Sequence, residues 1–535
     1  MISVIALQPF DIFVFTLFLT TSYLLVTVFQ SLFFHPLSHV PGPLLARLSP
    51  WPSAYHARKG NRHLWLERLF SQYGPKIRIT PDCVLFRNPS AHRDIYNSRA
   101  NVRRADFYNA LARHEKELNT FTSVENAEHH RRRRLLDLAF TNKSLKASTS
   151  FMQHHIDRWH ELTLRESIRG DWTPPINFTD WANFLVFDIL GDVCFGRSFG
   201  TKEPDENPIK VVPRSSVELM KSMYMIAKSP FLRVVRYLRP KGLGSLLMAT
   251  RDKTTLAFDD FAEESTTERL RCEHREEGTR EDMVHFLYHA KDPKTGNPGY
   301  DEKSLVAELR LIIIAGSDST SVTLSGLLFY LSHYPHVLKK LQQEITSAFA
   351  SIGEIEPGTK LSSCKYTRAC IDEALRMSPA GLSELPRTVL RGGITIDGEF
   401  YPEGITVGTA GWADNRNAQV YGDPEIFRPE RWLISKDNTA EQVSQIKANF
   451  HPFSIGPHNC AGMSFALQEL MLVVAKTIYK LEFRLAPEWA RGEGARHTSS
   501  MNGKDVPCFH LQDAFIVERD GPVLQFRKRQ IVSTP

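Results

Sequence analysis

One short segment constrains the fold of this chain more than any other part of its sequence. Residues 453–462, FSIGPHNCAG, place Cys460 between Gly456 and Gly462 and seven positions after Phe453. The residues that follow have the apolar spacing of a buried amphipathic helix. We therefore expect Cys460 near a helix N-terminus. There, free N–H groups and the helix dipole stabilise an anion and can lower the pKa of a thiol from about 8.5.

The residue types around Cys460 suit a metal ligand, because a thiolate binds metals and a thiol does not. Gly456 permits a turn that a side chain would block. Gly462 lets a flat ligand approach the backbone, and Phe453 can cover the sulfur. A lone cysteine more often packs as a small buried hydrophobe. The fixed spacing of four residue types instead indicates a thiolate ligand for a haem iron.

The pattern F-x-x-G-x-x-x-C-x-G resembles the haem-binding loop of the cytochrome P-450 superfamily of haem-thiolate monooxygenases. The resemblance covers nearly all of the chain after residue 35, and three further motifs occur in family order. It implies a mostly α-helical cytochrome P-450 fold with small β-sheets, and haem b held by an axial thiolate from Cys460. Phe453, Gly456 and Gly462 would then belong to the haem-binding loop.

A second motif lies inside residues 302–333, a long apolar-periodic segment that we predict to be one helix. It contains A-G-S-D-S-T at residues 315–320, although Gly, Asp and Ser are unfavourable in a helix interior. Such a break indicates a functional site, while a kink or a close helix crossing would also explain it. The segment resembles the family's A-G-x-D-T-T oxygen-binding groove, with Ser319 in place of the usual first threonine. The resemblance implies that Asp318, Ser319 and Thr320 deliver protons for cleavage of the O–O bond.

The third motif is Glu373-Ala-Leu-Arg376, followed some fifty residues later by the segment 427–432, FRPERW. A Glu–Arg pair three residues apart on a helix is usually a solvated surface pair. Its position in this chain resembles the E-x-x-R and P-E-R elements of the family. The resemblance implies a buried triad of Glu373, Arg376 and Arg431 behind the cysteine loop.

Three basic residues would hold the haem propionates by the same resemblance. Arg133 stands four residues after His129, which takes the tryptophan place of the family's W-x-x-x-R motif. Arg387 matches the strand arginine after the E-x-x-R helix. His458 occupies the site, two residues before the cysteine, where the family usually has arginine. Histidine near pH 7 is only partly protonated, so this contact differs from the usual permanent charge.

An uncharged apolar stretch at residues 12–34 precedes the rest of the chain. As a helix it would span roughly 35 Å, which is enough to cross a bilayer core. A cleaved signal peptide is the alternative, but it would have a shorter apolar region preceded by positive charge. No Lys or Arg occurs before Arg47, so the positive-inside rule places the C-terminal side in the cytosol.

We therefore expect four parts along the chain. These are a short luminal N-terminus at 1–11, a transmembrane anchor at 12–34, a proline-rich hinge at 35–50 and the catalytic domain at 51–535. A hydrophobic anchor followed by P-G-P resembles the microsomal members of the family. It implies a single-pass protein of the endoplasmic reticulum membrane whose catalytic domain faces the cytosol.

Composition excludes several other functions. The seven cysteines are scattered without a C-x-x-C pair, which argues against zinc sites and a redox dithiol. The net charge of +6 is small for 535 residues. The run Arg131–Arg134 lies in a segment with helical apolar spacing, so we expect no nucleic-acid partner.

These features together predict an enzyme that inserts one atom of O2 into a hydrophobic small molecule. No G-x-G-x-x-G fingerprint for a flavin or dinucleotide occurs, so electrons would come from NADPH through a separate partner, NADPH-cytochrome P-450 reductase. The chain looks most like fungal members that act on secondary-metabolite intermediates. Two alternatives remain open at this point: a haem-thiolate isomerase or dehydratase without a reductase, and a membrane-tethered haem-binding sensor.

Overall fold

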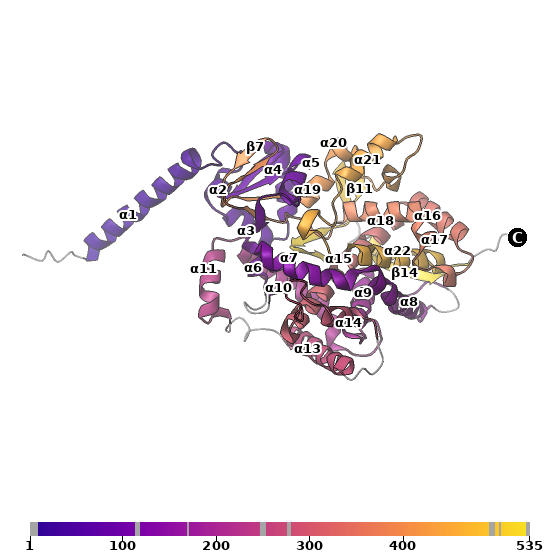
Figure 1. Ribbon diagram of the computed structural model, residues 1–535. Helices are drawn as coiled ribbons and strands as arrows, with labels where there is room; N and C mark the ends of the chain where they lie inside the picture. The colour runs from indigo at the N-terminus through magenta and orange to yellow at the C-terminus, as the bar shows by residue number, and fades with distance from the viewer. Residues whose placement is uncertain are drawn as a thin grey trace, which may run out of the picture.

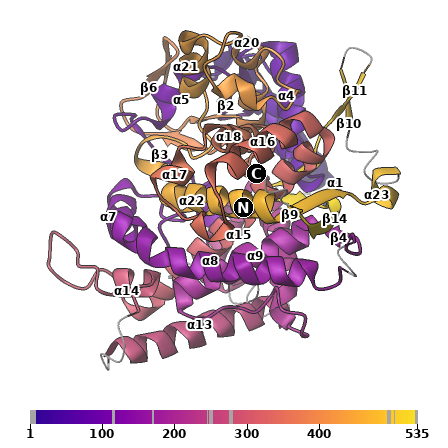
Figure 2. The same cartoon turned by 90° about the vertical axis from the view of Figure 1, so that its right-hand side faces the viewer.

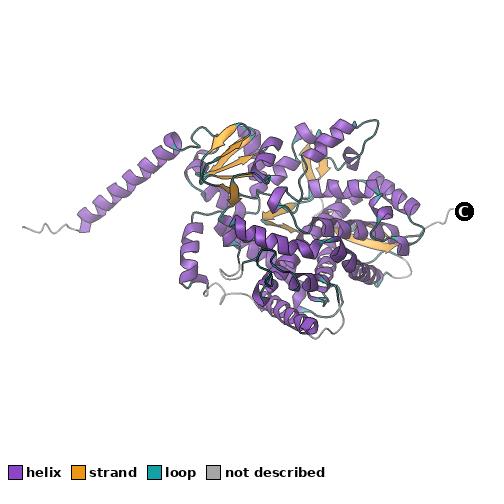
Figure 3. Ribbon diagram, in the orientation of Figure 1, coloured by secondary structure: helices purple, strands orange, loops and turns teal. Residues whose placement is uncertain are grey.

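Helices make up most of this molecule, and short strands form small sheets between them (Figures 1 and 3). The computed structural model describes residues 9–112, 118–167, 171–244, 246, 253–274, 280–491, 498–501 and 504–530. The helices are α1 Pro9–Phe29, α2 Leu44–Leu48, α3 Trp51–Arg58, α4 Arg62–Tyr73, α5 Pro89–Tyr96, α6 Phe107–Ala110, α7 Asn126–Leu136, α8 Asn142–Leu164, α9 Phe178–Phe195, α10 Val212–Ala227, α11 Leu232–Leu238, α13 Lys253–His274, α14 Met283–Tyr288, α15 Glu302–His333, α16 Pro335–Ala348, α17 Thr359–Ser362, α18 Lys365–Met377, α19 Gly411–Asn415, α20 Ala418–Tyr421, α21 Ala440–Ala448, α22 Met463–Lys480 and α23 Pro487–Arg491.

The strands are short, and the largest sheet has five of them in the order β1-β2-β8-β5-β3. Strands β2 and β8 in this sheet are parallel, and the remaining pairs are antiparallel. The expected fold class, mostly α-helical with small sheets, is confirmed. The strands are β1 Lys76–Thr80, β2 Cys83–Phe86, β3 Val102–Arg104, β4 Ile176–Asn177, β5 Arg387–Val389, β6 Ile394–Ile396, β7 Glu399–Tyr401, β8 Thr406–Thr409, β9 Leu481–Leu485, β10 Thr498–Met501, β11 Lys504–Pro507, β12 Leu511–Ala514, β13 Ile516–Arg519 and β14 Val523–Lys528.

Helix α15 runs through the main hydrophobic core, with the bounds expected from its apolar periodicity. The Asp301 side chain accepts a hydrogen bond from the Ser304 N–H and so caps its first turn. The helix packs most extensively against α9, and it also contacts α18 and α22. Figure 2 shows α15 between α22 on one side and α8 and α9 on the other. Most residues of α15 are therefore enclosed by neighbouring elements, and Ser317 and Thr320 are buried.

The N-terminal helix α1 projects away from the folded domain (Figure 1). Residues 13–34 have a mean hydropathy of 1.7 and none of the segment is buried, so it is long and apolar enough to cross a membrane. Helix α15 passes the same test of length and composition but is mostly buried in the core. Of the predicted luminal segment, residues 1–8 lie outside the described part of the chain.

The predicted hinge at 35–50 is packed against the domain. Leu37 and Val40 are fully buried in a small core formed with the five-stranded sheet. The backbone N–H of Arg78 on β1 donates to the Pro41 carbonyl at 2.7 Å, and its guanidinium donates to the Leu37 carbonyl. The segment therefore forms part of the surface of the domain rather than a free linker.

Candidate functional site

The loop around Cys460 is closed by its own backbone. The Cys460 N–H donates to the Phe453 carbonyl at 2.9 Å, while the Phe453 ring packs half-buried against the main core. Gly456 has a φ of +70°, and a Cβ there would lie 2.0 Å from the Tyr96 carbonyl oxygen. A side chain at Gly456 is thus excluded by both backbone conformation and space. Gly462 has no such restriction, and a Cβ there would lie 4.0 Å from the Cys460 sulfur.

The pKa of the Cys460 thiol differs from the value expected for a cysteine at a helix N-terminus. Helix α22 begins at Met463. Although Cys460 is exposed, desolvation of its sulfur by the surrounding loop raises the pKa of the thiol, and this effect outweighs the Gly462 N–H and the charge of Arg133, both of which lower it. The expected fall in pKa at the helix N-terminus is therefore wrong for the folded chain alone. A cation bound at the sulfur would remove the proton instead.

A cluster of basic side chains lies beside the cysteine loop. Arg133 donates from its Nη atoms to the carbonyl and side-chain oxygens of Asn459, at 2.5 and 2.9 Å. The His458 and His129 rings meet, with Nδ1 of the former 3.2 Å from Nε2 of the latter. The structure therefore brings two of the three predicted propionate residues to the loop, and it pairs His458 with a histidine.

Arg387 and Arg104 complete this basic cluster from two paired strands, β5 and β3. Arg387 is buried and donates to the Tyr108 hydroxyl at 3.2 Å. Arg104 donates to the backbone carbonyls of Thr120 and Phe121, both at 2.5 Å. No motif had indicated Arg104, since a single arginine on a short strand carries no sequence signal.

The basic cluster is rich in donors and poor in acceptors. Burial, with repulsion from the neighbouring cations, lowers the pKa of Arg104 to about 9 and that of His129 to about 2, and also lowers the pKa of His458. Nε of Arg104, Nε of Arg387 and Nδ1 of His129 are buried without a hydrogen-bond partner among the described residues. Unpaired buried donors are costly. The donor set therefore fits a ligand with carboxylate groups, such as the two propionates of haem.

The polar segment of α15 is continuous helix. Gly316 lies against α9, since a Cβ there would be 2.9 Å from a methyl group of Leu190. The close helix crossing left open as an alternative is therefore present. The Ser319 hydroxyl donates to the Ala315 carbonyl at 2.8 Å, competing with the backbone of its own helix as expected for such residues.

The predicted relay residues of α15 point to different partners. Asp318 accepts hydrogen bonds from Nη1 of Arg519 at 2.8 Å and from the Val517 N–H at 3.3 Å, both on β13. Thr320 is buried and lies beside Glu469 on α22. Burial raises the pKa of Glu469 to about 8. No hydrogen bond joins Asp318, Ser319 and Thr320 to one another in the described part of the chain.

The residues of the predicted lock lie together in the core. Glu373 accepts from Nη2 of Arg376 at 2.8 Å and from Nε of Arg431 at 2.9 Å, and all three side chains are fully buried. It also accepts from the Arg428 N–H and from Nε1 of Trp432. Burial alone would raise the pKa of Glu373, but the two guanidinium groups hold it below its ordinary value. This arrangement ties α18 to the 421–432 segment.

Two further buried acids join segments that are distant in the sequence. Glu308 on α15 accepts from the Thr120 N–H at 2.8 Å, and burial raises its pKa to about 7. Glu384 is paired with Arg62 of α4 and with Lys228 after α10, both at 2.5 Å.

A mostly helical fold, a cysteine loop before a buried helix and a cationic cluster beside it define a haem-thiolate protein. The sequence matches the family model described as Cytochrome P450 over residues 41–492, so this chain belongs to that family. Cytochrome P450 monooxygenase fscF from Fusarium equiseti is 33% identical over 518 residues, 95% of each chain. Cytochrome P450 monooxygenase AKT7 from Alternaria alternata is 31% identical over 517 residues, 95% of this chain and 96% of the relative. The protein is a haem-containing monooxygenase.

Proposed function

We propose that Cys460 is the axial ligand of the haem and that Arg104, Arg133 and Arg387 face its propionates, with the His129–His458 pair beside them. The observation that carries this proposal is the basic cluster next to the cysteine loop, with its unpaired buried N–H groups. When bound, haem supplies the activation of dioxygen, from which one oxygen atom is inserted into the substrate. Glu373, Arg376 and Arg431 act as a structural lock that holds the segment behind the loop.

The same proposal gives the residues of α15 a role in moving protons. The Asp318 carboxylate can accept a proton, and its hydrogen bond from Arg519 fixes its orientation. The carboxyl of Glu469 keeps its proton near neutral pH because its pKa is about 8, and it lies against Thr320. Ser319, next to Asp318 and Thr320 in the sequence, carries a hydroxyl that donates to the Ala315 carbonyl. Together they supply donors and acceptors on both sides of the helix.

We further propose a hydrophobic small molecule as the substrate, a secondary-metabolite intermediate in class, with electrons from NADPH through a separate reductase. An exposed apolar surface supports a position at the endoplasmic reticulum membrane. Trp51 and Phe231 contact each other with their ring centroids 5.4 Å apart, and both are more than half exposed. Their neighbours Leu45 and Tyr237 are also exposed. This surface and α1 would enter the bilayer together, with the catalytic domain in the cytosol.

The test of the ligand is the spectrum of the reduced, CO-bound protein. We expect the strongly red-shifted Soret band of a thiolate ligand in the wild type and in the Cys272→Ser control, which changes an exposed thiol far from the loop. Cys460→Ala should abolish the band. A normal band from Cys460→Ala would refute the assignment.

The test of the catalytic cycle is substrate-dependent NADPH consumption by microsomes that contain the protein and an added reductase. Consumption that rises with an apolar substrate and yields an oxygenated product supports the monooxygenase with a reductase partner. Product formation without reductase would instead favour the isomerase or dehydratase. Metabolite profiling of a deletion strain would identify the substrate.

A further inference from the structure

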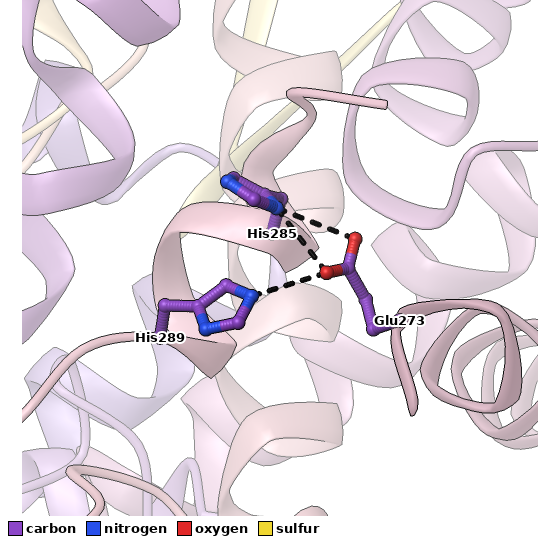
Figure 4. Close-up of side chains that lie close together, drawn as sticks. All are labelled: Glu273, His285 and His289. Carbon is purple, nitrogen blue, oxygen red and sulfur yellow. Dashed lines mark hydrogen bonds and ion pairs between the residues drawn. The ribbon is translucent and has the colours of Figure 1, made fainter. Parts of the chain in front are cut away.

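Two histidines and a glutamate converge on one point of the surface, away from the cysteine loop. Glu273 lies in the last turn of α13, His285 lies on α14, and His289 follows α14 directly. Nδ1 of His285 and Nε2 of His289 lie 3.2 and 3.1 Å from the same Glu273 oxygen, Oε2. Figure 4 shows both rings directed at this carboxylate. All three ligand atoms lie within 4.8 Å of one another.

We propose that Glu273, His285 and His289 bind a divalent transition-metal ion, for which Zn²⁺ is the probe. One carboxylate and two imidazoles form a donor set that suits zinc, nickel and copper. Zinc–ligand bonds of about 2.0–2.1 Å place neighbouring ligand atoms of a tetrahedron about 3.3 Å apart. The two measured nitrogen–oxygen distances, 3.2 and 3.1 Å, are close to that edge length.

The spacing along the chain supports the same geometry. His285 and His289 are four residues apart, so one helical turn brings their side chains to the same face. Their ring centroids are 4.8 Å apart. His285 is held in place because its backbone N–H donates to Asp282, whereas the His289 side chain is 56% exposed and can adjust. A metal ion would therefore meet two largely fixed ligands and one adjustable ligand.

The surroundings of Glu273 resemble an outer ligand shell. Arg269 donates to the other carboxylate oxygen, Oε1, at 2.5 Å, and this contact leaves Oε2 facing the imidazoles. Arg269 also pairs with the buried Asp282 at 2.8 Å, so its positive charge is balanced by a second acid. Side chains that bond to a ligating carboxylate fix its orientation in metal sites. The fourth position, next to the exposed His289, would be open to water.

Bound metal would fasten the end of α13 to α14. Helix α13 also packs against α9, α10 and α15, and α14 packs against α9 and α15. Because the metal binds only the folded arrangement, it should stabilise the native protein. This inference is independent of the haem site, so the CO spectrum should not change when the metal is added or removed.

The experiment measures Zn²⁺ binding to the haem-loaded, full-length protein after removal of any affinity tag. Wild-type protein stripped with a chelator should take up one Zn²⁺ per chain, measured by calorimetric titration and elemental analysis. His289→Ala and Glu273→Gln should each weaken binding by on the order of 100-fold, because losing a direct ligand costs at least as much as losing an outer-shell partner. Saturating Zn²⁺ should raise the thermal unfolding midpoint of the wild type by about 2 °C or more, and not that of His289→Ala.

Two control variants separate the site from unspecific binding. His336→Ala removes an exposed histidine on α16 outside the cluster and should bind as the wild type does. Cys272→Ser removes the exposed thiol next to Glu273 in the sequence and should also bind normally. The proposal is overturned if the wild type takes up no zinc at micromolar free metal. It is also overturned if His289→Ala retains wild-type affinity, or if uptake depends on Cys272 instead.

Discussion

Replacing Glu373 by alanine should be among the most destabilising single changes in this protein. The Glu373 carboxylate accepts five hydrogen bonds, two from Arg376 and one each from Arg428, Arg431 and Trp432. Without it, two fully buried guanidinium groups lose their shared counter-charge. Breaking a buried ion pair in this way costs about 3–5 kcal/mol. That is a large fraction of the total stability of a typical protein, about 5–15 kcal/mol.

Urea unfolding of the detergent-solubilised holoprotein measures this cost. We expect the midpoint for loss of helical circular dichroism to fall by on the order of 1 M in Glu373→Ala. Arg431→Ala should cost less, because Glu373 then keeps one of its two guanidinium partners. The control is Glu161→Gln, which breaks an exposed Arg158–Glu161 pair with the same spacing of three residues. It should leave the midpoint unchanged.

The pH dependence of Glu373→Ala provides a second check. The folded-state pKa of Glu373 lies below its ordinary value of 4.5. Its contribution is therefore fully present above pH 4.5 and is lost as the pH falls through the folded-state value. The difference in urea midpoint between the wild type and Glu373→Ala should therefore become smaller in acid. A midpoint for Glu373→Ala close to that of Glu161→Gln at neutral pH would refute the lock.

Three further predictions concern other groups. Burial raises the pKa of Glu308 to about 7, so the wild type should lose stability as the pH rises from 4.5 to 7. Urea titrations of Glu308→Gln should show a smaller loss over this range. An unchanged dependence of the urea midpoint on pH would contradict the raised pKa of Glu308. Asp318→Asn should lower turnover by roughly 100-fold or more while leaving the CO spectrum unchanged; near-normal turnover would remove Asp318 from the relay. Residues 177–179 (Asn-Phe-Thr) form an N-glycosylation sequon, and the Asn177 side chain caps α9 and donates to Asp520 at 2.7 Å. If the domain faces the cytosol, this sequon should stay unmodified, and a glycosidase-sensitive shift lost in Asn177→Gln would contradict that orientation.

Sequence patterns predicted those parts of the site whose residues lie close together in the sequence. The bounds of α15 followed from apolar periodicity, and the positive φ of Gly456 followed from its place in the loop. Contacts between distant segments could not be predicted this way. Asp318 and Arg519 are 201 residues apart, and β13 carries no pattern that aims an arginine at α15. Glu469 could have been suspected, because it is a lone acid in the apolar run of α22.

The thiol of Cys460 shows why the direction of a pKa shift could not be predicted from neighbouring residues in the sequence alone. Position near a helix N-terminus does act in the expected direction, through the Gly462 N–H. The sign of the net pKa shift is set by burial, which depends on how the whole domain encloses the loop. A sequence motif can identify the helix end, but it does not report the desolvation of the sulfur by residues from other parts of the chain.

Two departures from the family pattern lie in contact with each other in the structure. His129 stands where tryptophan is usual and His458 where arginine is usual, and taken separately each weakens the resemblance. In the structure their ring nitrogens are 3.2 Å apart, although 329 residues separate them. Burial and repulsion by the neighbouring cations lower both pKa values, which favours the neutral form of each ring. The arginines beside the loop are Arg133, Arg387 and Arg104, and no sequence motif indicated the third of them.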